Sequence, residues 1–211
     1  LSQRVWANLI LLVLCYTCVF ASTTLMIGGA ALATLSVGGD SSNAPVAQGV
    51  FFVGAAAVSI FTAPLFDRLG RRFGFAVGSC IGIVGGCIGM GGIFASSTAL
   101  VILSAFPTGM ATGVGLHLRF AAMEVVREEV KPFAMTLVLS GGCIAAFLGP
   151  ESQLATTGIF GENLEYFGLF MMIVIFNAVG AILVLFVKFP AEEDDSTEDL
   201  ETVEEDGVMR V

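Results

Sequence analysis

The sequence is poor in charged residues and in histidine. Charged residues make up 13% of the 211 residues, against roughly 25% in soluble domains, and the single histidine is His117. Hydrophobic residues make up 56% of the chain, and the mean hydropathy is +0.91. This composition excludes a soluble enzyme, and no cluster of His, Asp and Ser would serve a membrane-embedded one. Because helices satisfy their own backbone inside lipid, the long apolar runs predict an all-α polytopic membrane protein.

Lysine and arginine are also scarce, with 9 in the whole chain. No basic patch interleaved with aromatic residues occurs, so we expect no nucleic-acid partner. The net charge of −9 comes from the C-terminal end, since 10 of the 18 acidic residues lie between Glu192 and Asp206. With almost no apolar surface to bury, residues 191–211 are predicted to form a disordered acidic cytoplasmic tail or the start of a linker.

The cysteines do not predict a metal or redox site. All five lie inside apolar stretches: Cys15, Cys18, Cys80, Cys87 and Cys143. Cys15 and Cys18 have C-x-x-C spacing, but a metal or redox site would need accessible thiolates and further ligands, and His117 is distant in sequence. We expect the cysteines to pack as small hydrophobic residues, and we expect neither a metal nor a cofactor.

Six apolar segments are each long enough to cross a bilayer, which takes about 20 residues. They run from about 6 to 34, 46 to 66, 73 to 95, 98 to 120, 133 to 156 and 165 to 188. We therefore predict a bundle of six transmembrane helices over residues 1–190, surrounded by a lipid bilayer. In the third segment, glycines recur every four residues and predict a face for close helix packing: Gly74, Gly78, Gly82 and Gly86.

The basic residues fall on one side of the six predicted helices. They are Arg4, Arg68, Arg71, Arg72, Arg119, Arg127, Lys131, Lys188 and Arg210. The opposite side carries only acidic residues: Asp40, Glu151, Glu162 and Glu165. Because Lys and Arg collect in cytoplasmic loops, we predict an integral, multi-pass protein with both termini in the cytoplasm.

The densest charge cluster before the tail lies between the second and third apolar segments. Its sequence is Asp67-Arg68-Leu69-Gly70-Arg71-Arg72. Glycine tolerates the tight backbone of a hinge loop, and an acid among three arginines can exchange salt bridges and cap helix ends as helices tilt. The cluster is predicted to act as a conformational latch. The alternative is a positive anchor that only orients the chain.

This cluster resembles motif A of the major facilitator superfamily, G-x-x-x-D-R-x-G-R-R/K, which lies between the second and third transmembrane helices. The matching residues are Asp67, Arg68, Gly70, Arg71 and Arg72, while Ala63 replaces the leading glycine. The resemblance implies that these residues gate the protein by latching onto its second half, and that they do not contact the substrate. Arg119, near the cytoplasmic end of the fourth segment, is expected to pair with Asp67 or Glu124, or else to snorkel to the interface.

The fifth segment resembles motif C of the same superfamily, G-x-x-x-G-P-x-x-G-G, a feature associated with antiporters. Gly149 and Pro150 match. Ala145 replaces the first glycine, and Gln153-Leu154 replace the final pair. The resemblance favours export of the solute by antiport.

The resemblance covers residues 1 to about 190, which is one six-helix half of this fold. It implies a proton-coupled secondary transporter of a small molecule that works by alternating access. Two six-helix halves are needed for such a movement, so the second half is expected either in the same longer chain or in another copy. The alternative is a non-transporting six-span membrane protein that serves in assembly or regulation.

Within the predicted membrane segments, Glu151 is the candidate for proton coupling. Ionisable groups inside membranes are costly and therefore functional candidates, and the neighbouring Pro150 breaks the local backbone hydrogen bonding. The alternative is that the fifth helix ends early and that Glu151 is an ordinary loop acid.

Polar residues on the first, second and fifth segments are predicted to line a central cavity. They are Asn8, Tyr16, Thr17, Ser22, Thr23, Thr24, Gln48 and Gln153. Hydroxyls and amides with few charges would suit a neutral or amphipathic small solute. His117 is expected to have a structural role at a helix end.

Overall fold

The computed structural model describes residues 3–161 and 164–189, and these residues form helices and connecting turns without a strand. In chain order they are α1 (Gln3–Ser36), α2 (Ala44–Phe94), α3 (Thr98–Gly115), α4 (Leu118–Glu124), the 3-10 helix η1 (Glu128–Val130), α5 (Lys131–Thr156) and α6 (Phe167–Phe186). The all-α prediction is confirmed. The predicted acidic tail over residues 191–211 and the predicted loop acid Glu162 lie outside the described residues.

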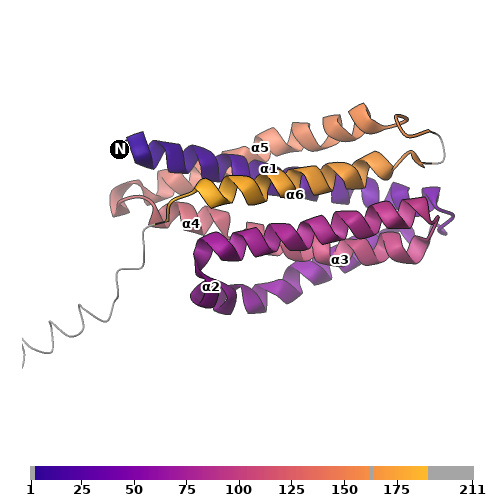
Figure 1. Ribbon diagram of the computed structural model, residues 1–211, viewed down its shortest axis with the longest axis horizontal. Helices are drawn as coiled ribbons and strands as arrows, with labels where there is room; N and C mark the ends of the chain where they lie inside the picture. Colours follow the sequence, from indigo (N-terminus) through magenta and orange to yellow (C-terminus); the bar gives the residue numbers. More distant parts are fainter. Residues whose placement is uncertain (1–2, 162–163, 190–211) are drawn as a thin grey trace, which may run out of the picture.

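Five helices of the described chain are long and apolar enough to cross a membrane, where six were predicted. The difference lies in α2, which has 51 residues. A straight helix of that length would measure about 77 Å, more than twice the ~30 Å hydrocarbon core. Instead, α2 turns back on itself, so that its two halves run in opposite directions along the bundle (Figure 1) and both pack against α3. The second and third predicted segments are both present, as the two arms of one bent helix.

The bend of α2 occurs at one residue. Gly70 has φ 74° and ψ 158° and is the residue of α2 with non-helical backbone angles. This backbone region is open almost only to glycine. The charged segment was predicted to be a loop between two helices. It is instead a sharp bend within one helix, which we call the corner, because the residues on both sides of Gly70 keep helical geometry.

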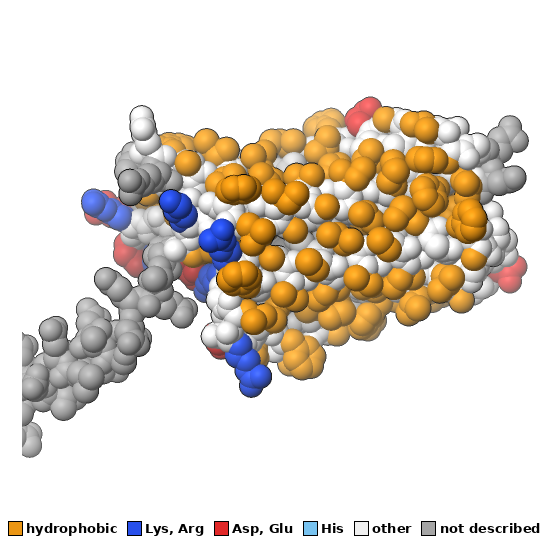
Figure 2. Space-filling model, viewed as in Figure 1, with side chains coloured by type: hydrophobic (Ala, Val, Ile, Leu, Met, Phe, Trp, Pro, Cys, Tyr) orange, Lys and Arg blue, Asp and Glu red, His pale blue; other side chains and the backbone are white. Residues whose placement is uncertain are grey.

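α1 and α3 are the most buried of the spanning helices, and α2 and α5 are the most exposed. One apolar core cluster centres on Leu9 and Leu12 near the start of α1, and a second centres on Leu25, Phe51 and Phe170. Hydrophobic side chains also cover the outside, as Figure 2 shows. An apolar exterior is expected where lipid rather than water surrounds the helices.

The Lys and Arg side chains visible in Figure 2 gather at one end of this apolar surface. The bend of α2, the short helix α4 and the end of α6 all lie at that end, together with the N-terminus (Figure 1). We call it the basic end. The arrangement follows from the alternating direction of successive helices, which brings every second connection to the same side.

The predicted glycine face of the third segment packs against other helices. Gly78 faces Val114 of α3, and Gly82 faces Asn177 of α6, so closely that a side chain on either glycine would collide. These contacts let the second arm of α2 approach α3 and α6.

Candidate functional site

At the basic end, the corner of α2 is tied to α4. The guanidinium of Arg71 forms an ion pair with the carboxylate of Glu124. The same guanidinium carbon lies 5.6 Å from the centroid of the Phe66 ring, over its face. Arg71 therefore joins the two sides of the corner to the helix that follows α3.

The other charged motif residues point outward. Asp67, Arg68 and Arg72 are all exposed. Among the described residues, the two ion pairs are Arg71 with Glu124 and Lys131 with Glu128, so Asp67 takes part in neither. This leaves the Asp67 carboxylate available to a partner outside the described chain.

Aromatic rings support the corner from inside. The Phe66 ring lies 4.7 Å from Phe75 and 5.9 Å from His117, measured between centroids. A ring nitrogen of His117, Nδ1, is 3.1 Å from the carbonyl oxygen of Gly113. His117 thus joins the end of α3 to the aromatic cluster, which agrees with the structural role expected of it.

Arg119 of α4 is held at the edge of the interior. Its Nε is buried and has no hydrogen-bond partner among the described residues. Its guanidinium carbon lies 4.8 Å from the centroid of the Phe120 ring. Glu124, one of its two expected partners, pairs with Arg71.

Four of the eight polar residues predicted to line a cavity, Asn8, Tyr16, Gln48 and Gln153, contact neighbouring parts of the chain. Asn8 exchanges two hydrogen bonds with the backbone of Lys188, donating to its oxygen at 2.8 Å and accepting from its nitrogen at 3.3 Å. Tyr16 is buried and stacks on Phe20, with 4.4 Å between the ring centroids. These contacts place Asn8 beside the end of α6 and Tyr16 in the interior of the bundle.

The other two cavity candidates converge on one stretch of α1. Gln48 of α2 donates from Nε2 to the carbonyl of Ile27 at 2.7 Å. Gln153 of α5 approaches Gly29, where an added Cβ would lie 3.2 Å from its Oε1. Between them, Gly28 is exposed, and a Cβ added there would meet nothing within 4 Å. Two amide side chains thus flank an open face of α1 that carries Gly28.

In α5, Gly149 lies against α1 and Glu151 points away from the core. A side chain at Gly149 would collide with the hydroxyl of Thr24. Glu151 is exposed, and α5 continues past it and past Pro150 to Thr156. Glu151 is therefore a residue of the helix and not of a loop.

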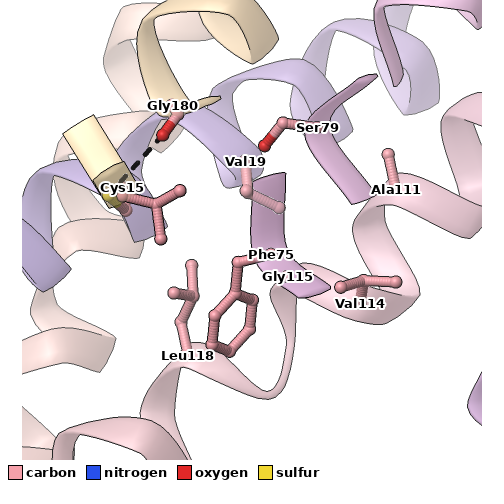
Figure 3. A pocket seen from close by; sticks show the side chains of 10 residues that line it. Cys15, Val19, Phe75, Ser79, Ala111, Val114, Gly115, Leu118 and Gly180 are labelled. Atoms are coloured by element: carbon pink, nitrogen blue, oxygen red, sulfur yellow. Dashed lines mark hydrogen bonds between the residues drawn. The ribbon is translucent and has the colours of Figure 1, made fainter. Parts of the chain in front are cut away.

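A small cavity lies elsewhere in the bundle, between α1, the second arm of α2, α3, α4 and α6 (Figure 3). Its volume is about 10 Å³, room for roughly one water molecule. Phe75 and Leu118 lie along one side in the view, and Ser79 and the carbonyl of Gly180 along the other. A cavity of this size is a packing defect and does not hold a transported solute.

Among the described residues, no group of His, Cys, Asp and Glu side chains is arranged to hold a metal ion. Cys15 and Cys18 are free and buried, and the other three cysteines are free and exposed on the apolar surface. The Sγ of Cys15 contacts the carbonyl oxygen of Gly180 at 3.9 Å.

Residues 12–206 match the Major Facilitator Superfamily. The chain belongs to this superfamily. The match includes the bent helix α2 with its charged corner and almost all of the described bundle, so the resemblance drawn from motif A is confirmed at the level of the family.

Two members of the superfamily illustrate the relationship. The chain is 26% identical to the riboflavin transporter RfnT of Brucella anthropi over 149 residues. This aligned region covers 71% of this chain and 37% of that protein. The chain is 27% identical over 164 residues to the uncharacterized MFS-type transporter YddS of Bacillus subtilis, covering 76% of this chain and 37% of that protein. The chain thus spans little more than a third of the length of either relative.

One polar residue of this superfamily member was missed by sequence reasoning. Asn177 of α6 is 3% exposed, and its Nδ2 donates to the hydroxyl of Ser22 at 3.1 Å and to the carbonyl of Ile173 at 2.9 Å. A signal was present, because this amide lies in the most apolar of the spanning helices, with a mean hydropathy of 2.7. Intramembrane polar groups of this kind are expected to have a specific partner.

Proposed function

We propose that the chain forms one half of a secondary transporter that moves a small solute across a membrane by alternating access. The carrying observation is the corner of α2, where Gly70 places the charged motif at one end of the bundle and Arg71 joins it to Glu124 of α4. Membership of the superfamily supports the same reading. The second six-helix half would come from the same longer chain or from another copy.

In this proposal, the corner gates the transporter at its cytoplasmic side. Arg71 and Gly70 build the corner, while Asp67, Arg68 and Arg72 present charges to the opposite half. An ion pair across two moving halves can form in one state and break in the other, so it biases their equilibrium. Arg119 contributes positive charge beside the corner.

The solute is proposed to meet the open face of α1 around Gly28. Gln48 and Gln153 lie on either side of this face and offer amide groups, and the glycine leaves room for close approach. Amides without a formal charge suit a neutral or amphipathic solute. Because one relative is named a riboflavin transporter, riboflavin is the first solute to test.

Proton coupling is proposed to pass through Glu151, with exchange in the export direction as the resemblance of Gly149-Pro150 to motif C implies. A carboxylate on an apolar membrane helix is costly, so its presence favours a function. Its exposure in this half leaves it accessible to a second half or to a water-filled path.

The gating role is tested with Asp67→Asn in the complete protein, reconstituted in vesicles with labelled riboflavin. We expect a loss of transport of at least about tenfold, since one latch charge is worth on the order of 1.4 kcal/mol in the balance of states, while the protein still inserts and folds. Asp40→Asn is the matched control, because Asp40 is also exposed but lies in the turn at the opposite end. Equal transport by both variants would overturn the gating role. Failure of the unaltered protein to carry riboflavin would overturn only the choice of solute.

A further inference from the structure

Three consecutive hydroxyl residues, Ser22, Thr23 and Thr24, lie at the middle of α1. Successive residues of an α-helix point about 100° apart around its axis. The three side chains therefore leave α1 in different directions, and each one meets a different helix.

Each of the three hydroxyls forms a hydrogen bond with a residue of another helix. Asn177 of α6 donates to the Ser22 hydroxyl at 3.1 Å. The hydroxyls of Thr23 and Thr112 of α3 share a hydrogen bond of 2.9 Å. The Thr24 hydroxyl shares its one hydrogen between the carbonyl of Ala21 in its own helix, at 2.9 Å, and the carbonyl of Ala145 of α5, at 3.4 Å. One short stretch of α1 is thus bonded to α6, α3 and α5.

Glycines provide the space for two of these contacts. Gly82 of α2 leaves room for the Asn177 amide, and Gly149 of α5 leaves room for the Thr24 hydroxyl; a side chain on either glycine would collide with that polar group. The Asn177 and Thr24 contacts therefore occur where a glycine of a neighbouring helix permits close packing.

The three bonds together resist rotation of α1 about its own axis. A rotation by one residue would separate all three pairs at once. The hydroxyls would keep only their intrahelical acceptors, the carbonyls of Cys18, Val19 and Ala21, so the cost is the loss of the three interhelical bonds. If the rotation gives each residue the direction of the next, Gly28, which is exposed, takes the buried direction of Gly29, and Ala30, which is fully buried, takes the half-buried direction of Ala31.

We propose that Ser22, Thr23 and Thr24 are positioning residues that, with Asn177 and Thr112, fix the rotation of α1. They keep the face around Gly28 turned toward the solute pathway. This inference rests on the proposed transport function, since it gives that face its purpose, but its test needs no solute.

The test measures which residues of α1 react with a membrane-impermeant, water-soluble maleimide. The complete protein is used with its natural cysteines replaced by alanine and a single new cysteine, Gly28→Cys or Ala30→Cys. An accessible thiol reacts and a buried one is nearly inert, so Gly28→Cys should react at least about tenfold faster than Ala30→Cys. Equal rates would overturn the proposal.

Thr23→Val and Asn177→Leu are then combined in both cysteine backgrounds. Each interhelical hydrogen bond in a membrane shifts an equilibrium by roughly threefold, so losing two should reduce the ratio of reaction rates by up to about ninefold. When Thr23→Ser takes the place of Thr23→Val in the combined variant, part of the ratio of reaction rates should be restored, because serine keeps the hydroxyl.

Thr34→Val is the matched control. Thr34 is a buried threonine of α1 whose hydroxyl donates to the carbonyl of Ala30 in its own helix at 2.8 Å, so its loss should leave the ratio unchanged. If the combined variant does not fold, Thr24→Val alone gives the same reading through α5. A folded variant with lower thermal stability but an unchanged ratio would show a merely structural role and would overturn the proposal.

Discussion

At the scale of single residues, Gly149 shows how a motif position can be explained by packing. The residue is buried in α5 against the hydroxyl of Thr24, and a side chain there would displace that hydroxyl or press α5 away from α1. The matched glycine of the antiporter motif therefore has a local role in this bundle, whatever the direction of transport.

We expect Gly149→Ala to destabilise the folded bundle by about 1–3 kcal/mol, the usual cost of overpacking a filled interior. The measurement is the shift of the thermal unfolding midpoint in detergent. Gly91→Ala is the control, because Gly91 is exposed and an added Cβ would meet nothing within 4 Å. A control shift as large as that of Gly149→Ala would contradict the packing argument.

Glu151 carries the prediction on pH. Glu151→Gln keeps the shape of the side chain and removes its ionisation, so we expect loss of proton-driven transport while counterflow exchange of the solute continues. Transport would be measured across a range of pH values with and without a proton gradient. Glu165→Gln is the control, since Glu165 is also an exposed acid at the end opposite the corner. An unaltered pH dependence in Glu151→Gln would exclude proton coupling through this residue.

At the scale of helices, the corner of α2 depends on one glycine. Gly70→Ala would place a side chain in a backbone region that costs on the order of 1–3 kcal/mol for residues other than glycine. We expect a lower thermal unfolding midpoint and a changed angle between the arms of α2. The spacing of spin labels attached to the two arms would report the angle.

Leu69→Ala is the neighbouring control for this prediction. Leu69 is exposed beside the corner but has helical backbone angles. Its replacement should leave both the unfolding midpoint and the label spacing nearly unchanged. If the two variants behave alike, the corner is held by the surrounding contacts and not by the backbone of Gly70.

The helices could be predicted from the sequence because length and hydropathy decide whether a segment crosses a membrane. The continuity of α2 through its corner could not, since composition does not report which backbone hydrogen bonds persist through a turn. From the sequence, Gly70 was predicted to permit a tight backbone turn. The structure shows that this one residue is enough to reverse the direction of the helix.

The candidate site was less predictable than the helices. Arg71 was expected in a latch, but its pairing with Glu124 joins residues on different helices and depends on how those helices pack. Gln48 and Gln153 were expected to face a cavity, which stays a prediction. Their convergence on one stretch of α1 follows from tertiary structure alone. Asn177 was overlooked because its neighbours in sequence are apolar.

At the scale of the whole molecule, the charges give the protein a direction. The corner of α2, α4 and the end of α6 share the basic end. We predict that this end lies in the cytoplasm, because Lys and Arg are retained there. An impermeant thiol reagent applied to intact cells should label Asp40→Cys and spare Leu69→Cys, and both should react after the cells are opened. Labelling of Leu69→Cys in intact cells would reverse the assigned orientation.

The tightness of the corner also bears on how the protein is made. The two arms of α2 are joined through a single non-helical residue. Because no flexible linker separates them, one arm cannot insert into the bilayer independently of the other. During biosynthesis, the arms would have to enter the membrane as a pair. The exposed arginines at the corner would then stay on the side from which insertion began. The bend would thus serve assembly before it serves the finished protein.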